Sequence, residues 1–164
     1  MLDSQRRSRR SVRKKGHDYC GPGVYFVTIC TQEGRPWLGD VAEGVVKINA
    51  RGRMVERWWL ELVRKFPSVA LGTYVIMPDH MHGIVILRDA SSGVSLPQVI
   101  HWFKTMTTNA YLRDVRQHLW PHPLRRLWHR NYHDRIICHH LALGRVQRYI
   151  AAHPITKVDL SVAQ

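Results

Sequence analysis

The stretch "VALGTYVIMPDHMHGIVIL", residues 69–87, decides the fold because two β-type runs flank a tight Met-Pro-Asp turn. The second run contains two histidines, His80 and His82, where Val or Ile would pack better in a strand. Successive side chains of a strand point to opposite faces, so these two share one face while Met81 and Gly83 share the other. The pair indicates a metal or phosphate site, or alternatively two half-exposed histidines on a solvated edge.

The residues before this stretch predict one strand and one helix. A β-rich run extends from Val24 to Cys30, and residues 32–46 predict a loop or a small irregular hairpin. Apolar residues at helical spacing follow Asn49, and Pro67 ends that pattern. A helix is therefore expected between Asn49 and Pro67.

The residues after the stretch predict a helix, a strand and a last helix. A link at residues 89–95 precedes a helix over 96–115, and a short strand is expected within 130–138. The last helix covers residues 141–154 and is expected to stop at Pro154.

This order is typical of the α+β class, as a ferredoxin-like βαββαβ antiparallel sheet with an added C-terminal helix that carries Tyr149. In this topology the strand with His80 and His82 is central, where buried imidazoles need polar partners.

Charge is the second informative feature of the chain. The 164 residues carry a formal net charge of +13, and residues 1–18 predict a flexible basic arm ahead of a single domain over 19–164. The arm holds seven cations, namely Arg6, Arg7, Arg9, Arg10, Arg13, Lys14 and Lys15. The chain beyond residue 15 is also basic, with 18 Lys and Arg against 11 Asp and Glu. A basic body as well as a basic arm favours a nucleic-acid partner.

The cysteines and the hydropathy pattern bear on the compartment. Cys20, Cys30 and Cys138 are odd in number and form no CxxC pair, which favours a reducing cytoplasm over a disulfide framework. The sequence has no apolar run of membrane-spanning length and no signal-peptide pattern, so we expect no contact with a membrane.

The last predicted helix offers further groups for a site. Tyr149 and His153 are four residues apart and share a helix face. If that face packs over the strand that carries His80 and His82, three imidazoles and a phenol converge. The alternative is that Tyr149 packs its ring and His153 caps the helix end, where positive charge is favoured.

Four segments in a fixed order carry a family resemblance: "HDYCGPGVYFVTICTQ", "MPDHMHGIVI", "LWHRNYHDRII" and "RYIAAHP". Together they resemble the REP-associated tyrosine transposases, a branch of the single-tyrosine HUH (His–hydrophobe–His) transposases. The resemblance implies that His80 and His82 bind a divalent ion, magnesium or manganese, and that Tyr149 is the nucleophile. In the family pattern "YIxxNP" an amide completes the metal site, and His153 stands at that position here. Imidazole suits manganese or another transition ion better than magnesium.

The resemblance also implies the activity. It predicts an endonuclease and strand transferase that nicks and rejoins single-stranded DNA near palindromic hairpins through a 5′-phosphotyrosine on Tyr149. The expected partner is single-stranded or hairpin DNA in a bacterial cytoplasm, at the nucleoid, and the protein acts as a homodimer or a monomer. Two alternatives stay open: a hairpin-binding module that has lost cleavage, which His153 in place of an amide would explain, and an unrelated metal-dependent nucleic-acid hydrolase.

Basic residues within the domain are further candidates for DNA contacts. Beside the arm, these are Lys104, Arg130, Arg145 and Arg148. Trp102, Trp128 and Tyr132 are interleaved with basic residues and either stack on unpaired bases or belong to the core.

Overall fold

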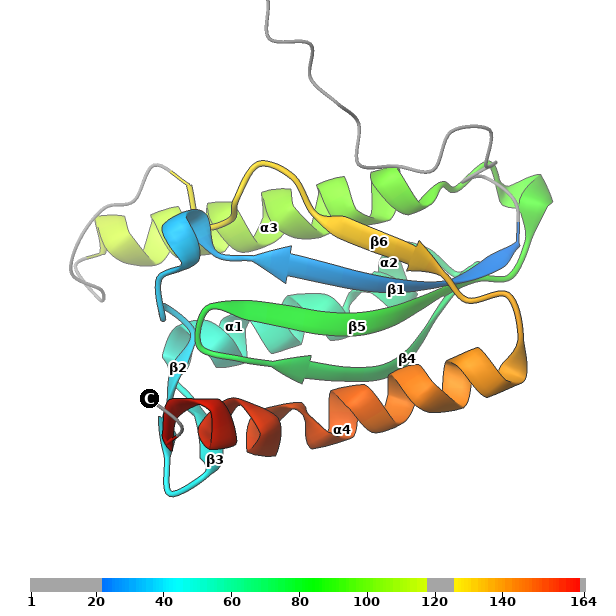
Figure 1. The fold of residues 1–164 in the computed structure, drawn as a ribbon. Helices are drawn as coiled ribbons and strands as arrows, with labels where there is room; N and C mark the ends of the chain where they lie inside the picture. Colours follow the sequence, from blue (N-terminus) through cyan, green and yellow to red (C-terminus); the bar gives the residue numbers. More distant parts are fainter. Residues whose placement is uncertain (1–21, 118–125, 163–164) are drawn as a thin grey trace, which may run out of the picture.

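The computed structural model describes residues 22–117 and 126–162, and its central element is a four-stranded sheet (Figure 1). The strands are β1 (Gly23–Cys30), β4 (Val69–Ile76), β5 (His80–Leu87) and β6 (His133–Ile136). They lie in the order β4-β5-β1-β6, and each neighbouring pair is antiparallel. The predicted α+β class with an antiparallel sheet is confirmed, and β5, which carries the two histidines, is a central strand.

Helices cover both faces of this sheet (Figure 1). Helices α1 (Ala50–Leu60), α2 (Leu62–Lys65) and α3 (Leu96–Arg116) lie on one face, and α4 (His140–Val162) crosses the other. With α1 and α2 counted as one helix, the core elements follow the predicted chain order of strand, helix, strand, strand, helix, strand and helix. Within the described residues, no helix combines the length and the apolar character needed to cross a bilayer.

Polar side chains fix the starts of α1 and α3. The side-chain oxygen of Asn49 accepts from the backbone N–H groups of Arg51 and Gly52, which satisfies two donors that the first helical turn leaves unpaired. Ser95 and Gln98 form a capping box at the start of α3. The predicted helix between Asn49 and Pro67 is interrupted at Glu61, where α1 gives way to α2.

The segment predicted as a loop or a small irregular hairpin forms a β-hairpin. Strands β2 (Gly39–Ala42) and β3 (Val45–Ile48) pair through a two-residue turn in which Glu43 and Gly44 both have positive φ. Two 3-10 turns, η1 (Gln32–Gly34) and η2 (Ala90–Ser92), complete the described elements.

The prediction that Pro154 ends the last helix is wrong, because α4 continues to Val162. Proline lacks one backbone N–H and so removes one helical hydrogen bond, but the residues beyond it can keep helical geometry when the chain continues in the same direction. The short strand expected within residues 130–138 is present and pairs with β1 over His133–Ile136.

Strand β5 shows how alternation divides the sheet into two faces. Met81 and Val85 are buried in the large core that also contains side chains of α1 and α3. Gly83 shares this face, and a β-carbon there would lie 2.4 Å from Cζ2 of Trp59. Ile84, on the opposite face, belongs to a small apolar cluster with residues of α4. His80 and His82 have the same parity as Ile84, so the strand directs both toward α4.

Candidate metal and tyrosine site

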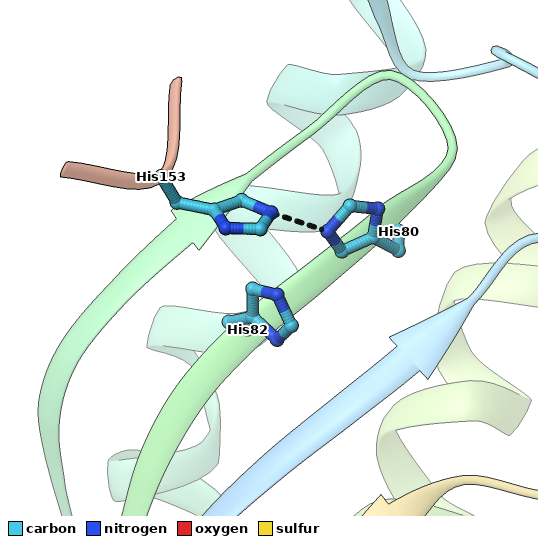
Figure 2. A group of neighbouring side chains, drawn as sticks. All are labelled: His80, His82 and His153. Carbon is cyan, nitrogen blue, oxygen red and sulfur yellow. Dashed lines mark hydrogen bonds between the residues drawn. The ribbon is translucent and has the colours of Figure 1, made fainter. Parts of the chain in front are cut away.

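Three histidines converge between the sheet and α4 (Figure 2). His80 and His82 project from β5, and His153 projects from α4. One nitrogen from each ring can be chosen so that all three lie within 4.8 Å of one another. The predicted convergence is therefore observed. The alternative of two half-exposed histidines on a solvated edge is wrong for His82, which is 5% exposed in a central strand.

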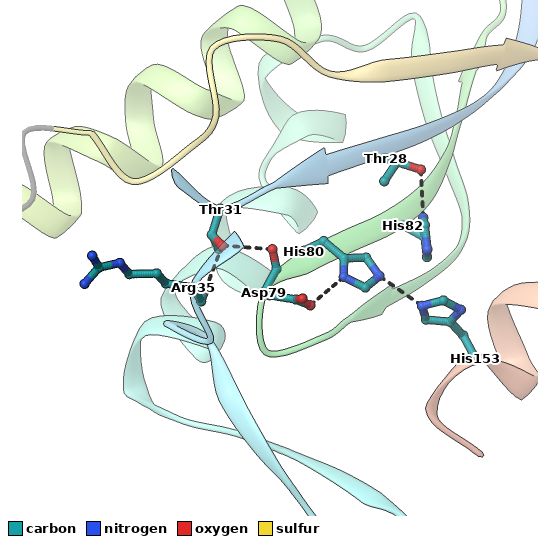
Figure 3. A network of polar contacts seen from close by, with 7 residues as sticks. All are labelled: Thr28, Thr31, Arg35, Asp79, His80, His82 and His153. Carbon is teal, nitrogen blue, oxygen red and sulfur yellow. Dashed lines mark hydrogen bonds and ion pairs between the residues drawn. The ribbon is translucent and has the colours of Figure 1, made fainter. Parts of the chain in front are cut away.

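Hydrogen bonds orient the two histidines of β5 (Figure 3). Nδ1 of His80 lies 2.7 Å from Oδ1 of Asp79, and Nδ1 of His82 lies 2.8 Å from Oγ1 of Thr28. An ionised carboxylate only accepts hydrogen bonds, so the Nδ1–H group of His80 donates a hydrogen bond to Asp79. A neutral His80 then presents a lone pair at Nε2. Such a partner on the second ring nitrogen is typical of metal-binding histidines, because it fixes the tautomer and the ring orientation.

Buried Thr31 fixes the position of the turn that carries Asp79 (Figure 3). The Thr31 hydroxyl lies within hydrogen-bonding distance of the carbonyls of Asp79 and Arg35, and the Thr31 backbone N–H also donates to the Asp79 carbonyl. The backbone N–H of Met77 donates to the carbonyl of His80 and closes the tight turn. The support for His80 therefore extends from the ring through Asp79 into the backbone.

The donor set fits a divalent ion. Nε2 of His80 and Nε2 of His153 are 2.9 Å apart in a hydrogen bond. A divalent ion held by these two nitrogens would take the place of the proton that they share in this hydrogen bond. Three imidazoles suit manganese, zinc and other transition ions better than the harder magnesium.

Tyr149 lies one helical turn before His153 on the same side of α4. Its ring centroid is 5.1 Å from that of His153, 5.5 Å from that of His82 and 6.1 Å from that of Phe26. Tyr149 is 48% exposed, so the residue is accessible from solvent while its ring contacts the site. The alternative role of His153 as a helix-end cap is excluded, because α4 does not end there.

A cavity of about 490 Å³ opens beside Tyr149 and His82 and extends toward β6. Its lining includes Arg145 of α4 and Arg135 of β6. The guanidinium of Arg135 lies 5.9 Å from the centre of the Phe26 ring, which is within range of a cation–π contact. The site therefore combines imidazoles, an accessible phenol and fixed positive charge, which together suit chemistry on a phosphodiester.

Comparison with known proteins identifies the family. The model of the family described as "Transposase IS200 like" matches residues 55–153, a range that contains all three histidines and the tyrosine. This chain belongs to that family. The resemblance seen in the sequence motifs is confirmed at this level, and the protein is an enzyme of the transposase kind.

Relatives of the IS200-like chain support the same fold. An uncharacterised protein of Haemophilus influenzae is 28% identical over 171 residues, covering 90% of this chain and 88% of that protein. A REP-associated tyrosine transposase solved bound to a REP hairpin superposes with a TM-score of 0.66 at 17% identity, covering 88% of this chain and 74% of that one. A putative transposase from Deinococcus radiodurans has a TM-score of 0.55 at 16% identity, covering 85% and 96%.

The candidate DNA-contact residues are distributed over both sides of this transposase fold. Arg145 and Arg148 are exposed on α4 near Tyr149, and Arg130 is exposed before β6. Lys104 lies on α3, where its ammonium donates to the carbonyls of His129 at 2.7 Å and Arg130 at 2.9 Å. Burial lowers the pKa of Lys104 to about 8. The cations from Arg6 to Lys15, like the whole arm predicted over residues 1–18, lie outside the described residues.

The aromatic residues proposed for base stacking belong to the core. Trp102 packs edge-on against Trp58 and Phe66. Trp128 is buried, and its indole N–H donates to the Thr107 hydroxyl at 2.7 Å. Tyr132 is partly buried against the same core.

Sequence reasoning missed several site residues, namely Phe26, Thr28, His133 and Arg135. A signal was present for Thr28, because it is the one Ser or Thr in the apolar strand "VYFVTIC" and faces the site. The others could not be found without the register between β1 and β6.

Proposed function

We propose that this IS200-like protein cleaves and rejoins single-stranded DNA beside palindromic hairpins through a covalent 5′-phosphotyrosine on Tyr149. The observation that carries the proposal is the position of an accessible phenol within ring contact of His82 and His153. In this proposal residues 19–164 form one catalytic domain.

The phenol oxygen of Tyr149 attacks the scissile phosphorus, and the bond from phosphorus to the 3′-oxygen of the upstream strand breaks. The phenol proton passes to solvent, which reaches the half-exposed side chain, and the released 3′-oxygen takes up a proton to leave a free 3′-hydroxyl. Attack on the phosphotyrosine by another 3′-hydroxyl rejoins a strand, because the phosphotyrosine retains a phosphoester bond for exchange.

His80, His82 and His153 would hold a divalent ion, for which manganese or another transition metal is the best match. When bound, such an ion neutralises negative charge that develops on the non-bridging phosphate oxygens. The residues themselves supply orientation: Asp79 and Thr28 fix the rings of His80 and His82, and α4 brings His153 and Tyr149 to them.

The proposed ligand is single-stranded or hairpin DNA. A positive charge of +13 supports a polyanionic partner, and the solved REP-associated transposase is bound to a REP hairpin. In the proposal, the arm from Arg6 to Lys15 contacts the hairpin or its flank, and Lys104, Arg130, Arg145 and Arg148 contribute further cations. The protein would act at the nucleoid in the bacterial cytoplasm, as a homodimer or a monomer.

The test is incubation of the full-length protein with end-labelled single-stranded DNA and manganese, followed by a denaturing gel. A covalent adduct that is absent without a divalent ion supports the proposal. Cleavage without an adduct would instead indicate a metal-dependent hydrolase. Retention on a native gel with neither product would indicate a hairpin-binding module that has lost its chemistry.

A further inference from the structure

A cavity lies beside Tyr149, and only one of the three site histidines lines it. His82 and Tyr149 form one wall of this cavity of about 490 Å³, and residues of β6 form another. Neither His80 nor His153 lines it. The cavity is therefore a space next to the nucleophile that shares only His82 with the proposed metal ligands.

Strand register explains why β6 reaches the nucleophile. Thr28 of β1 pairs with His82 of β5 and also with His133 of β6. Paired residues of neighbouring strands point to the same face, so these three side chains form a row across the sheet under α4. Neighbouring strands are about 4.8 Å apart, which places the backbone of His133 about 10 Å from that of His82.

The next row along the same strands holds a positioned cation. Phe26 pairs with Arg135, whose guanidinium lies 5.9 Å from the centre of the Phe26 ring. Phe26 also stacks on His82 at 5.2 Å and meets the Tyr149 ring edge-on at 6.1 Å. Phe26 thus links Arg135 to the nucleophile through direct ring contacts.

A second cation enters the cavity from α4. Arg145 lies four residues before Tyr149, on the same side of the helix, and lines the cavity opposite β6. Among the described residues, Asp134 is the one acidic residue in the lining, and it pairs with Val27, whose side chain is buried in the core on the other face of the sheet. The guanidinium groups therefore dominate the charge of the cavity.

The geometry of displacement at phosphorus indicates which part of a strand reaches this cavity, provided that the proposed function holds. The attacking and leaving oxygens lie roughly in line, so the departing 3′-oxygen points away from Tyr149. The 5′-oxygen of the retained strand and the non-bridging oxygens radiate sideways from that line. The histidine cluster and the cavity meet at His82, whereas His80 and His153 lie outside the cavity lining.

We propose that this cavity binds the first nucleotide of the retained strand, the strand that becomes joined to Tyr149, and that Arg135 and Arg145 hold the phosphodiester that follows it. Guanidinium groups suit this task because their paired N–H donors match phosphate oxygens.

The test combines DNA with one neutral linkage and protein with one cation removed. One oligonucleotide carries a methylphosphonate at the first phosphodiester on the 3′ side of the scissile phosphate, and another carries it on the 5′ side. Each is used with the wild type, Arg135→Gln, Arg145→Gln and the matched control Arg57→Gln, whose side chain is exposed on α1 at the other face of the sheet and outside the cavity lining. The rate of adduct formation is measured at limiting DNA.

We expect the 3′-side methylphosphonate to lower the wild-type rate roughly tenfold, the value of one charge-assisted hydrogen-bonding interaction. Arg135→Gln and Arg145→Gln should lower the rate on unmodified DNA by a similar factor and lose most of their sensitivity to that linkage. Arg57→Gln should keep the wild-type sensitivity to that linkage in full. The proposal would be overturned if the 3′-side methylphosphonate lowered the rate of adduct formation equally in the wild type and Arg135→Gln. It would also be overturned if the arginine variants lost sensitivity to the 5′-side linkage instead.

A binding measurement separates this inference from the proposed function. The same DNA and arginine variants are compared in a Tyr149→Phe background, where equilibrium affinity requires no chemistry. One outcome is that no adduct forms with any protein, but the 3′-side methylphosphonate lowers DNA affinity when Arg135 is present and not in Arg135→Gln. In that case the cavity assignment stands and the cleavage proposal fails. If adducts form but neither rate nor affinity shows that coupling, the cavity assignment fails and the cleavage proposal stands.

Discussion

The face of the sheet that packs against α1 and α3 and the face that α4 covers are built from the same strands but serve different purposes. Met81 and Val85 on the first face are fully buried among apolar neighbours. On the second face, the alternate positions of β5 hold His80 and His82, beside the exposed Arg135 and the half-exposed Tyr149. One face therefore provides a rigid base, and the other keeps polar groups in fixed positions near solvent.

This division shows that site side chains can be held in fixed positions with only a small apolar cluster beside them. The site side chains are oriented by single hydrogen bonds and ring contacts, such as those of His82 with Thr28 and Phe26. Changes on the core face should therefore alter the free energy of unfolding, whereas changes on the α4 face should alter chemistry and ion binding.

Tyr149→Phe should have the largest effect and should be confined to chemistry. The change removes the attacking oxygen and keeps the ring contacts with His82 and His153. We expect covalent adduct to disappear from a denaturing gel while hairpin affinity stays within about threefold, since one exposed hydroxyl contributes little to binding. A persisting adduct would show that the nucleophile is another residue.

Gly83→Ala should act on the core face alone. The added methyl group would meet the buried Trp59 ring at 2.4 Å, and overpacking of this kind costs about 2–3 kcal/mol in the free energy of unfolding. Gly144→Ala is the matched control, because no atom of the described part of the chain lies within 4 Å of its added β-carbon and alanine favours a helix interior by about 1 kcal/mol. Denaturant titration measures both. Equal stabilities for the two variants would contradict the close contact at Gly83.

Thr28→Val should lower ion affinity with little effect on folding. It removes the hydroxyl that lies 2.8 Å from Nδ1 of His82 and keeps the shape of the side chain. Loss of such a supporting group lowers metal affinity about 10-fold to 100-fold. Calorimetric titration with manganese measures the change, and Thr28→Ser, which retains a hydroxyl, should keep most of the affinity. Unchanged affinity in Thr28→Val would place His82 outside the metal site.

His153→Asn should change which ion is preferred. An amide oxygen is a harder ligand than imidazole, so the variant should gain activity with magnesium relative to manganese. The ratio of adduct formed with the two ions is compared in the wild type and the variant at one pH. Identical ratios would show that His153 does not bind the ion.

Lys104 should produce the smallest effect, visible only in alkaline solution. Burial lowers the pKa of Lys104 from its ordinary 10.5 to about 8, so between these values the unfolded chain binds more protons than the folded protein. Stability attributable to this residue should therefore rise as the pH increases from 8 to 10.5. The wild type should become more stable relative to Lys104→Met over this interval in chemical denaturation. Parallel pH profiles would contradict the burial of the ammonium group.

Local patterns in the sequence predicted most of the fold and the centre of the site. Alternation at His80 and His82 and the four-residue spacing from Tyr149 to His153 are periodic signals, so both could be read without a structure. Pro154 misled the prediction, because its effect on a helix is local and does not force the chain to turn. Arg135 and the carbonyl partners of Lys104 depend on pairings between distant segments, which no short stretch of sequence records.

The helix α4 holds half of the site but is attached to the sheet through a small apolar cluster of Ile84, Ile137, Val146 and Ile150. An ion bound jointly by β5 and His153 would link the sheet to α4. It would stabilise the docked helix by a free energy that increases with the logarithm of the ion concentration. Docking and ion binding would then be one linked equilibrium. Ion supply in the cell would set the fraction of molecules in which the tyrosine is held against the sheet.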